Sequence, residues 1–326
     1  MSPEPVEVLR WGILGCARIS RRGLIPGIQS SSFGKLVSLA SRDETLARTW
    51  AREFEIPRAC GSYEALLAAP EVQAVYIPLP NELHKPWVLA AADAGKHVLC
   101  EKPLALDARE ARLMVEHCQK RGVILMEAFM WRHQPRTAAL RRLVADGKIG
   151  ALRLVRSSFS FPIAAADWRL DPARGGGALW DVGCYGVSTA RLFAASEPEA
   201  IQAMAHVGNS GVDLTLTAEL AFREGVIAVL DCSFEQPFRC SYELVGTEGV
   251  IEVPDAYLPP EQALAFLRTG DSGERHELAF DGRNQYAAMI DAFALSVSNG
   301  QLADPAEDGL AQMQALDAIR AAARMV

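Results

Sequence analysis

Apolar residues in the first 125 positions form short runs that alternate with helical patterns. The apolar runs predict strands at 8–14, 36–40, 74–79, 97–100 and 123–127. The stretches between them predict a helix that ends at residue 28 and further helices at 45–54, 86–94 and 108–119. Repeated strand–helix units of this kind favour a parallel sheet with helices on both faces.

The pattern changes after about residue 128. A helix is predicted at 137–145, a long alternating strand at 152–161 and a second helix at 178–194. Further strands follow in close succession, at 200–207, 214–222, 226–234, 239–245 and 250–253. Consecutive strands joined by tight turns indicate a mainly antiparallel sheet. We therefore predict an α/β protein with one domain at 1–128 and another at 129–326. Its last helix, at about 307–323, packs either within the second domain or back on the first.

Composition excludes several classes of protein. The chain has 326 residues, a net charge of −7 and scattered lysines and arginines, so we expect no nucleic-acid partner. It has no apolar run of bilayer length and no signal-peptide pattern, so we expect no membrane partner. Seven cysteines without a C-x-x-C pair fit reduced thiols in a cytoplasmic protein. Because the histidines lack metal-binding spacings, we expect no metal site.

The first predicted strand ends in a glycine turn that opens a helix. Aligned on G-x-G-x-x-G, the three positions are Gly15, Ala17 and Ser20, so only the first is glycine. Such a turn needs small residues because the backbone N–H groups of the helix start approach a pyrophosphate. A glycine turn in an unrelated α/β protein is the alternative. The candidate cofactor contacts here are Gly12, Gly15, Cys16, Ala17, Arg18 and Ile19.

The end of the second predicted strand indicates which dinucleotide is bound. An NAD site normally has an acidic residue there, facing the ribose hydroxyls. Ser41 and Arg42 occupy this place, and a guanidinium can hold a 2′-phosphate through two hydrogen bonds. We therefore predict NADP (NADPH) as the cofactor. Two alternatives stay open: Ser41 and Glu44 have the spacing of a helix capping box, and Asp43 becomes the acidic residue if the register shifts by two.

Two other segments carry candidate catalytic groups. Glu101-Lys102-Pro103 follows the fourth predicted strand, at a sheet edge where ligands bind, although a surface lysine before a proline turn is as good an interpretation. We predict a cis peptide bond between Lys102 and Pro103. Gly175-Gly176-Gly177 precede a helix on which Asp181 and Tyr185 share one face. On spacing alone, a half-buried tyrosine and a solvated aspartate are the simpler interpretation, but a tyrosine near a lysine can act as a general acid/base.

Taken together, the motifs resemble those of the Gfo/Idh/MocA oxidoreductase family over essentially the whole chain. The matching segments are Gly12-Ile13-Leu14-Gly15-Cys16-Ala17, Pro80-Asn81-Glu82-Leu83-His84, Gly95-Lys96-His97-Val98-Leu99-Cys100-Glu101-Lys102-Pro103, Met126-Glu127-Ala128-Phe129-Met130-Trp131-Arg132 and the glycine-rich block that ends at Tyr185. The resemblance implies a Rossmann domain followed by an α/β domain with an open, mainly antiparallel sheet.

The resemblance also implies the catalytic residues. Lys102 is the lysine of an E-K-P motif, and the acid/base lies in a D-x-G-x-x motif that ends in histidine in many relatives but in Tyr185 here. With tyrosine rather than histidine at this position, the chain is similar to the branch of glucose–fructose oxidoreductase, dimeric dihydrodiol dehydrogenase and NADP-dependent xylose dehydrogenase. The expected activity is hydride transfer between NADP and a sugar or polyol. Tyr185 would be the acid/base, Lys102 would lower its pKa, and Asp181 would orient the substrate or Lys102.

Two other functions stay open. A nucleotide-sugar 3-ketoreductase would need a cleft wide enough for a diphosphate and a base. A regulator that binds NADP without chemistry could keep the glycine turn and lose the acid/base pair, so the presence of both Lys102 and Tyr185 argues against it.

The remaining candidate residues are less specific. His84 lies in the loop after the third predicted strand, where the nicotinamide half of the cofactor could pass. Its alternative interpretation is a residue at the start of a helix. The further cofactor candidates are therefore Pro78, Leu79, Pro80, Asn81, His84, Glu101 and Lys102. The substrate-cleft candidates are Trp131, Arg132, Trp168 and Arg169, with Arg169 as a surface partner of Asp171 the alternative. Because the strands at 214–222 and 226–234 are apolar, one sheet face needs a partner, and we expect a homodimer or a dimer-based oligomer.

Overall fold

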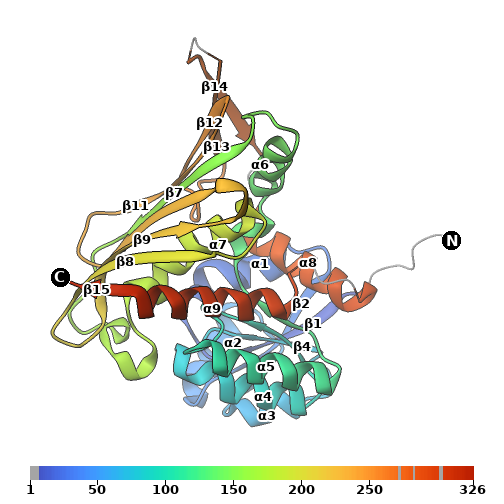
Figure 1. The fold of residues 1–326 in the computed structure, drawn as a ribbon. Coiled ribbons are helices and arrows are strands. Elements are labelled where there is room, and N and C mark those ends of the chain that lie inside the picture. Colours follow the sequence, from blue (N-terminus) through green and yellow to red (C-terminus); the bar gives the residue numbers. More distant parts are fainter. Residues whose placement is uncertain (1–6, 271–272, 282, 301–303) are drawn as a thin grey trace. The chain divides into compact units, whose positions relative to one another are not determined.

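A computed structural model describes residues 7–270, 273–281, 283–300 and 304–326 (Figure 1). The chain divides into two compact units, Met1–His133 with Asn284–Leu310, and Gln134–Arg283 with Ala311–Val326. The predicted division had a single domain boundary near residue 128. The structure differs from it, because Asn284–Leu310 belongs to the first unit. The last helix, α9 (Ala306–Ala322), begins in the first unit and continues in the second.

The first unit contains a six-stranded sheet in which all neighbouring strands are parallel, as predicted. The strands are β1 (Leu9–Leu14), β2 (Gly34–Ala40), β3 (Arg58–Cys60), β4 (Ala74–Ile77), β5 (His97–Cys100) and β6 (Leu125–Glu127). Their order in space is β3-β2-β1-β4-β5-β6. Because the direction of progression reverses between β1 and β4, the loops after these two strands flank the switch point where Rossmann folds bind dinucleotides.

Local signals in the sequence explain where several helices of this unit begin. Asp43, Ser62 and Asp107 each accept a hydrogen bond from a backbone N–H of the first turn that follows. The helical elements are η1 (Ser20–Leu24), α1 (Ile25–Ser30), α2 (Glu44–Glu53), α3 (Tyr63–Leu67), η2 (Asn81–Leu83), α4 (His84–Asp93), α5 (Ala108–Arg121), η3 (Met130–His133) and α8 (Gln285–Asn299).

Helix α8 completes the core of the first unit although it lies far along the chain. It packs against α1 and η3, and the ring of Phe293 lies 5.0 Å from that of Trp11 in β1. A Cβ at Gly23 or Gly27 would come within 2.4 Å or 2.5 Å of Tyr286, so these glycines allow the close approach of the two helical segments. No helix was predicted at the position of α8.

The second unit contains a nine-stranded sheet that is mostly antiparallel, as predicted. Only the β7–β10 and β8–β15 pairs are parallel among the described strand pairs. The order is β14-β13-β12-β11-β7-β10-β9-β8-β15. The strands are β7 (Leu152–Ser160), β8 (Ala200–Val207), β9 (Asp213–Ala221), β10 (Ile227–Ser233), β11 (Arg239–Gly246), β12 (Gly249–Pro254), β13 (Ala263–Thr269), β14 (Arg275–Phe280) and β15 (Ala323–Met325).

One face of this sheet packs on a helix that carries two of the predicted catalytic residues. The π-helical turn η6 (Leu179–Gly183) runs directly into α7 (Cys184–Ala194), and the pair packs on β7, β9 and β10. In β9, Leu216, Ala218 and Leu220 are buried while Thr217 and Glu219 are exposed, so the strand has one covered and one open face. The other helical elements of this unit are α6 (Pro135–Ala145), η4 (Trp168–Leu170), η5 (Pro172–Arg174) and η7 (Arg223–Gly225).

Candidate functional site

The glycine turn after β1 has the shape that a pyrophosphate site needs. Gly15 adopts a φ of +113°, and a Cβ there would lie 2.9 Å from Cδ2 of Leu79, so only glycine fits. The N–H of Ser20 donates to the carbonyl of Ala17 at 3.0 Å, which places residues 16–19 at the helix start. Backbone N–H groups of a first turn have no partner within their own helix and therefore suit an anion. These residues fit a dinucleotide phosphate.

The structure gives Gly12 a different explanation. It lies inside β1, and a Cβ there would come within 2.7 Å of Leu66 and 3.1 Å of Val72. Close packing of α3 and the following loop on the strand accounts for the glycine, so the structure lends no support to Gly12 as a cofactor contact.

The end of β2 leads directly into Ser41 and Arg42, the residues predicted to select NADP. The Ser41 hydroxyl accepts from the backbone N–H of Asp43 at 3.1 Å, and Asp43 in turn caps α2 by accepting from the N–H of Leu46 at 3.1 Å. The alternative in which Ser41 is the helix cap is therefore wrong. Because the Asp43 carboxylate caps the helix, its acidic group already has a structural role at this position.

The side chains of Tyr63 and Cys16 add polar groups around Gly15. Tyr63, which was not among the predicted site residues, is hydrogen-bonded to Arg42, and its hydroxyl lies 3.5 Å from the position that a Cβ of residue 15 would take. Burial raises the pKa of Tyr63, and Arg42 opposes that shift. Burial also raises the pKa of the Cys16 thiol to about 11, although a hydrogen bond to Ser41 lowers it. Cys16 is therefore a neutral thiol at physiological pH.

His84 is completely buried and holds two loops of the first unit together. Its Nδ1 lies 3.0 Å from the carbonyl oxygen of Pro103, and its Nε2 lies 2.8 Å from that of Leu79. Burial lowers the pKa of His84, with the carbonyl oxygens acting in the opposite direction. His84 thus links the loop after β4, which contains Pro78, Leu79, Pro80 and the buried Asn81, to the segment after β5.

The segment after β5 carries Lys102 on a constrained backbone. The Lys102–Pro103 peptide bond is cis, as predicted. The Tyr76 hydroxyl in β4 donates to the Glu101 carboxylate, whose other oxygen accepts from the backbone N–H of Lys102 at 3.3 Å. Glu101 therefore holds the Lys102 backbone, and the half-buried Lys102 side chain lies at the carboxyl end of the parallel sheet.

In the second unit, the structure brings Asp181 together with two of the substrate-cleft candidates. Arg169 donates from Nε to Asp181 at 2.8 Å and pairs with Asp167 at 3.2 Å, while its guanidinium lies 4.9 Å from the Trp168 ring. The partners of Arg169 are these two carboxylates rather than Asp171. Burial alone would lower the pKa of Arg169, but Asp181 and Asp167 outweigh burial and raise it.

Tyr185 lies in an aromatic cluster on the covered face of the nine-stranded sheet. Its side chain is buried, with ring centres 5.4 Å from Phe159 and 4.8 Å from Tyr257. The neighbouring rings fix the plane of the phenol, because each blocks rotation of the side chain. A phenol held in one orientation is suited to proton transfer, because its hydroxyl keeps a constant position.

Trp131 and Arg132 have structural partners in the first unit. Trp131 is fully buried, and the Arg132 guanidinium pairs with Asp304 at 3.2 Å and Asp308 at 2.5 Å. Burial would raise the pKa of Asp304, but His133 and Arg132 hold it below its usual range. These pairs join η3 to the start of α9, so the structure lends no support to a substrate contact by either residue.

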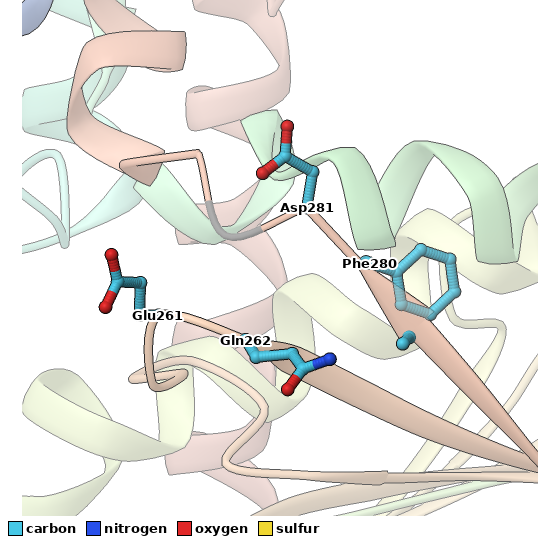
Figure 2. Close-up of a pocket in the computed structure, with 5 residues that line it drawn as sticks. Glu261, Gln262, Phe280 and Asp281 are labelled. Atoms are coloured by element: carbon cyan, nitrogen blue, oxygen red, sulfur yellow. The ribbon is translucent and has the colours of Figure 1, made fainter.

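One surface pocket of the second unit is lined by residues outside the predicted site. This shallow pocket is lined by Glu261, Gln262, Ala279, Phe280 and Asp281 (Figure 2), none of which was predicted to function. Among the described residues, no group of three or more His, Cys, Asp or Glu side chains is placed to hold a metal ion. The same residues include no helix with the length and hydropathy of a bilayer-spanning segment.

A Rossmann unit with a dinucleotide turn, joined to an open-sheet unit that carries a buried tyrosine, defines a class of nicotinamide-dependent oxidoreductases. Two family models match the chain: the oxidoreductase family with an NAD-binding Rossmann fold at residues 9–129, and the GFO/IDH/MocA C-terminal domain at residues 137–252. The chain belongs to the Gfo/Idh/MocA family of oxidoreductases, as the motifs predicted.

Two relatives that are named as dehydrogenases match more than four fifths of the chain. D-xylose 1-dehydrogenase (NADP(+)) 2 from Haloferax volcanii is 41% identical over 314 residues, which are 95% of this chain and 96% of that protein. Trans-1,2-dihydrobenzene-1,2-diol dehydrogenase from Mus musculus is 36% identical over 82% of this chain and 79% of that protein.

A solved structure extends the comparison to three dimensions. A 3-ketoreductase from Actinomadura kijaniata, in complex with NADP and TDP-benzene, matches with a TM-score of 0.91 and 33% identity over 98% of both chains. Variants of that enzyme have also been solved, one with a tyrosine replaced by phenylalanine and one with a lysine replaced by alanine.

Proposed function

We propose that this protein is an NADP-dependent oxidoreductase that transfers a hydride between the nicotinamide and a sugar or polyol. The observation that carries the cofactor assignment is the pair Ser41 and Arg42 at the end of β2, beside the Gly15 turn. The name of the xylose dehydrogenase relative and the NADP complex of the ketoreductase support the same cofactor. The sugar or polyol class rests on the activities of these relatives.

In this proposal, three residues assist the hydride transfer, each with its own role. When bound, the nicotinamide supplies or accepts the hydride. Tyr185 gives a proton to the substrate oxygen during reduction and takes it during oxidation. The ammonium of Lys102 favours the phenolate form of Tyr185, because a nearby opposite charge stabilises an anion. Asp181 is held by Arg169 and orients the substrate rather than transferring the proton.

A nucleotide-sugar 3-ketoreductase is a second candidate. The dTDP-3,4-didehydro-2,6-dideoxy-alpha-D-glucose 3-reductase of Saccharopolyspora spinosa is 34% identical over 94% of this chain. A turnover screen distinguishes the two candidates: aldoses, diols, free keto-sugars and a dTDP-linked keto-sugar are offered with NADP or NADPH. Turnover of free aldoses or diols supports the first function, and turnover confined to the dTDP-linked sugar supports the second. No oxidation or reduction of any of them would contradict both.

The cofactor assignment predicts a selective loss in Arg42→Ala. Binding of NADP should weaken by about 1–3 kcal/mol, the usual scale of a charge-assisted hydrogen bond, and binding of NAD should change little. Both affinities can be measured by fluorescence titration. Arg48→Ala is the matched control, because Arg48 is an exposed arginine on α2 that pairs with Glu44. Equal weakening of NADP and NAD in Arg42→Ala would refute the assignment.

We also infer a homodimer, or an oligomer built from dimers, that forms through the open face of the nine-stranded sheet. Met204 on β8 and Ile227 on β10 are 52% and 48% exposed there. A shallow groove on the same strands includes Met204 and Val229. Sedimentation velocity at micromolar concentration should give the mass of two chains, and Met204→Lys should shift the equilibrium towards one. A wild-type monomer would contradict this inference.

We place the enzyme in the cytoplasm. All seven cysteines are free thiols in the structure, which fits a reducing compartment. Fractionation of the source cells with an antibody against the chain tests this assignment, and recovery with the membrane or secreted fraction would contradict it.

A further inference from the structure

The helix that carries Asp181 and Tyr185 begins against a carboxylate from a neighbouring strand. Asp213 is the first residue of β9, and its Oδ2 accepts a hydrogen bond of 2.6 Å from the backbone N–H of Leu179. The N–H of Ala178 makes a second hydrogen bond to the same carboxylate. Asp213 is 34 residues from Leu179 in the chain, so this is a tertiary contact and not a local helix cap.

The glycine block before the helix is shaped around this carboxylate. Gly177 adopts a φ of +120°, and a Cβ there would come within 2.2 Å of Asp213 Oδ1. The glycine at this position therefore gives a group of the protein itself access to the helix start. At Gly177 the group that approaches is the side chain of Asp213.

The surroundings of Asp213 contain few groups that offset its charge. Arg320 on α9 exerts a favourable charge interaction, while its guanidinium lies 4.4 Å from the Trp180 ring and pairs with Asp317 at 2.7 Å. Burial raises the pKa of the Cys232 thiol on β10, and the charge of Asp213 adds to that rise. Burial raises the pKa of Asp213 to about 6, and the hydrogen bonds from the backbone of Leu179 and Ala178 and the charge of Arg320 act against this rise.

We propose that Asp213 is a positioning residue for proton transfer: by holding the N–H groups of Ala178 and Leu179, it fixes the start of the helix that places Asp181 and Tyr185. The inference rests on the proposed role of Tyr185. Asp181 lies two residues after Leu179, and Tyr185 lies one helical turn further on, so a shift of the first turn moves both side chains. Displacements of about 1 Å at a reacting group can lower turnover by roughly 10²-fold.

The charge state of Asp213 makes this positioning depend on pH. A carboxylate accepts stronger hydrogen bonds from N–H groups than a neutral carboxyl does. As the pH falls through about 6, Asp213 takes up a proton, the hold on the helix weakens, and kcat should fall. Stability moves in the opposite direction. Because the folded-state pKa is raised, the stability that this group contributes is present at low pH and is lost as the pH rises through about 6.

Asp213→Asn and Asp213→Ala test the proposal together. The asparagine keeps an oxygen acceptor without the charge, so its kcat should fall roughly 3- to 10-fold at pH 7.5 and should lack the acid step near pH 6. Its melting temperature at pH 7.5 should equal or exceed that of the wild type, because a partly buried charge is removed. The alanine loses the acceptor, and kcat should fall roughly 10- to 100-fold. The Kd for NADP should stay within twofold in both variants.

Glu199→Gln is the matched control, because it removes an exposed carboxylate just before β8 of the same sheet. Its kcat and pH profile should equal those of the wild type. An asparagine variant that keeps the wild-type acid step, or an alanine variant with wild-type kcat, would overturn the proposal. If the alanine variant does not fold, the asparagine variant decides.

Hydrogen exchange separates this inference from the proposed function. The amide hydrogens of Ala178 and Leu179 should be protected in the wild type at pH 7.5 and should exchange at least tenfold faster in Asp213→Ala. This measurement needs no substrate. If the wild type turns over no substrate, the proposed function fails whatever the exchange shows. If turnover is normal but these amides exchange equally fast in both proteins, only the positioning role of Asp213 fails.

Discussion

Replacing Tyr185 by phenylalanine is expected to lower kcat by roughly 10²–10⁴-fold, the usual contribution of a positioned general acid/base. The substitution keeps the ring, so its packing against Phe159 and Tyr257 should survive. Only the hydroxyl is lost, and with it the proton donor for reduction. Binding of NADP should be unchanged. Stopped-flow measurement of NADPH oxidation, with cofactor titration on the same samples, checks both expectations.

Tyr257→Phe is the matched control for this substitution. It removes another buried hydroxyl of the same unit, which is hydrogen-bonded to Thr189 at 2.9 Å. We expect a loss of about 1 kcal/mol in the free energy of unfolding and less than a threefold change in kcat. If Tyr185→Phe kept near-normal turnover across the pH range, Tyr185 would not be the acid/base. Both ring nitrogens of His84 are already hydrogen-bonded to backbone carbonyl oxygens. A bound water would then be the better candidate for the acid/base.

The parts of the fold that the sequence predicted are those with a local signal. The strands β1, β2, β4 and β5 are short apolar runs buried on both faces, and turns or helices with polar caps follow them. The glycine turn could be predicted because a φ of +113° beside Leu79 admits no side chain at Gly15. In the second unit, the alternation of β9 is visible in the sequence because only one face of the sheet is covered.

The parts that the sequence did not predict depend on tertiary contacts. Helix α8 is apolar almost all round, since it is buried among α1, η3 and β1, and it therefore lacks the polar stripe of a surface helix. Strand β3 has three residues and β15 has three, too few for a period to be seen. Asp213 reads as an ordinary strand-end aspartate, and only the fold brings it to Leu179.

For the site residues too, local motifs could be predicted from the sequence and distant contacts could not. Motifs placed Gly15, Ser41 and Lys102 correctly at the carboxyl edge of the parallel sheet, because strand ends follow from the strands. The ion pairs of Arg132 could not be predicted, because its partners, Asp304 and Asp308, lie more than 170 residues away. A charged residue next to a motif has no local sign of an ion pair with a distant segment. Charges near motifs therefore need the structure before a substrate role is assigned.

Replacing Lys102 by methionine is expected to lower kcat/KM at least as much as Tyr185→Phe does, because two contributions are lost together. Methionine matches the length of the apolar part of lysine and removes only the charge. In the proposed mechanism this charge has two tasks: it holds the substrate oxygen, and it favours the phenolate of Tyr185. Loss of the first task raises KM for the substrate, and loss of the second lowers kcat. Removal of Tyr185 alone affects mainly kcat.

The pH dependence of oxidation identifies the second task of Lys102. Oxidation requires the phenolate as the base, and a phenol without a neighbouring cation ionises at a higher pH. The pH–rate profile of Lys102→Met should therefore move to higher pH, so that part of the lost activity returns under alkaline conditions. Lys120→Met, at an exposed position on α5, is the matched control and should leave the profile unchanged. A Lys102→Met variant whose activity falls by the same factor at every pH would show that the ammonium binds substrate without tuning the tyrosine.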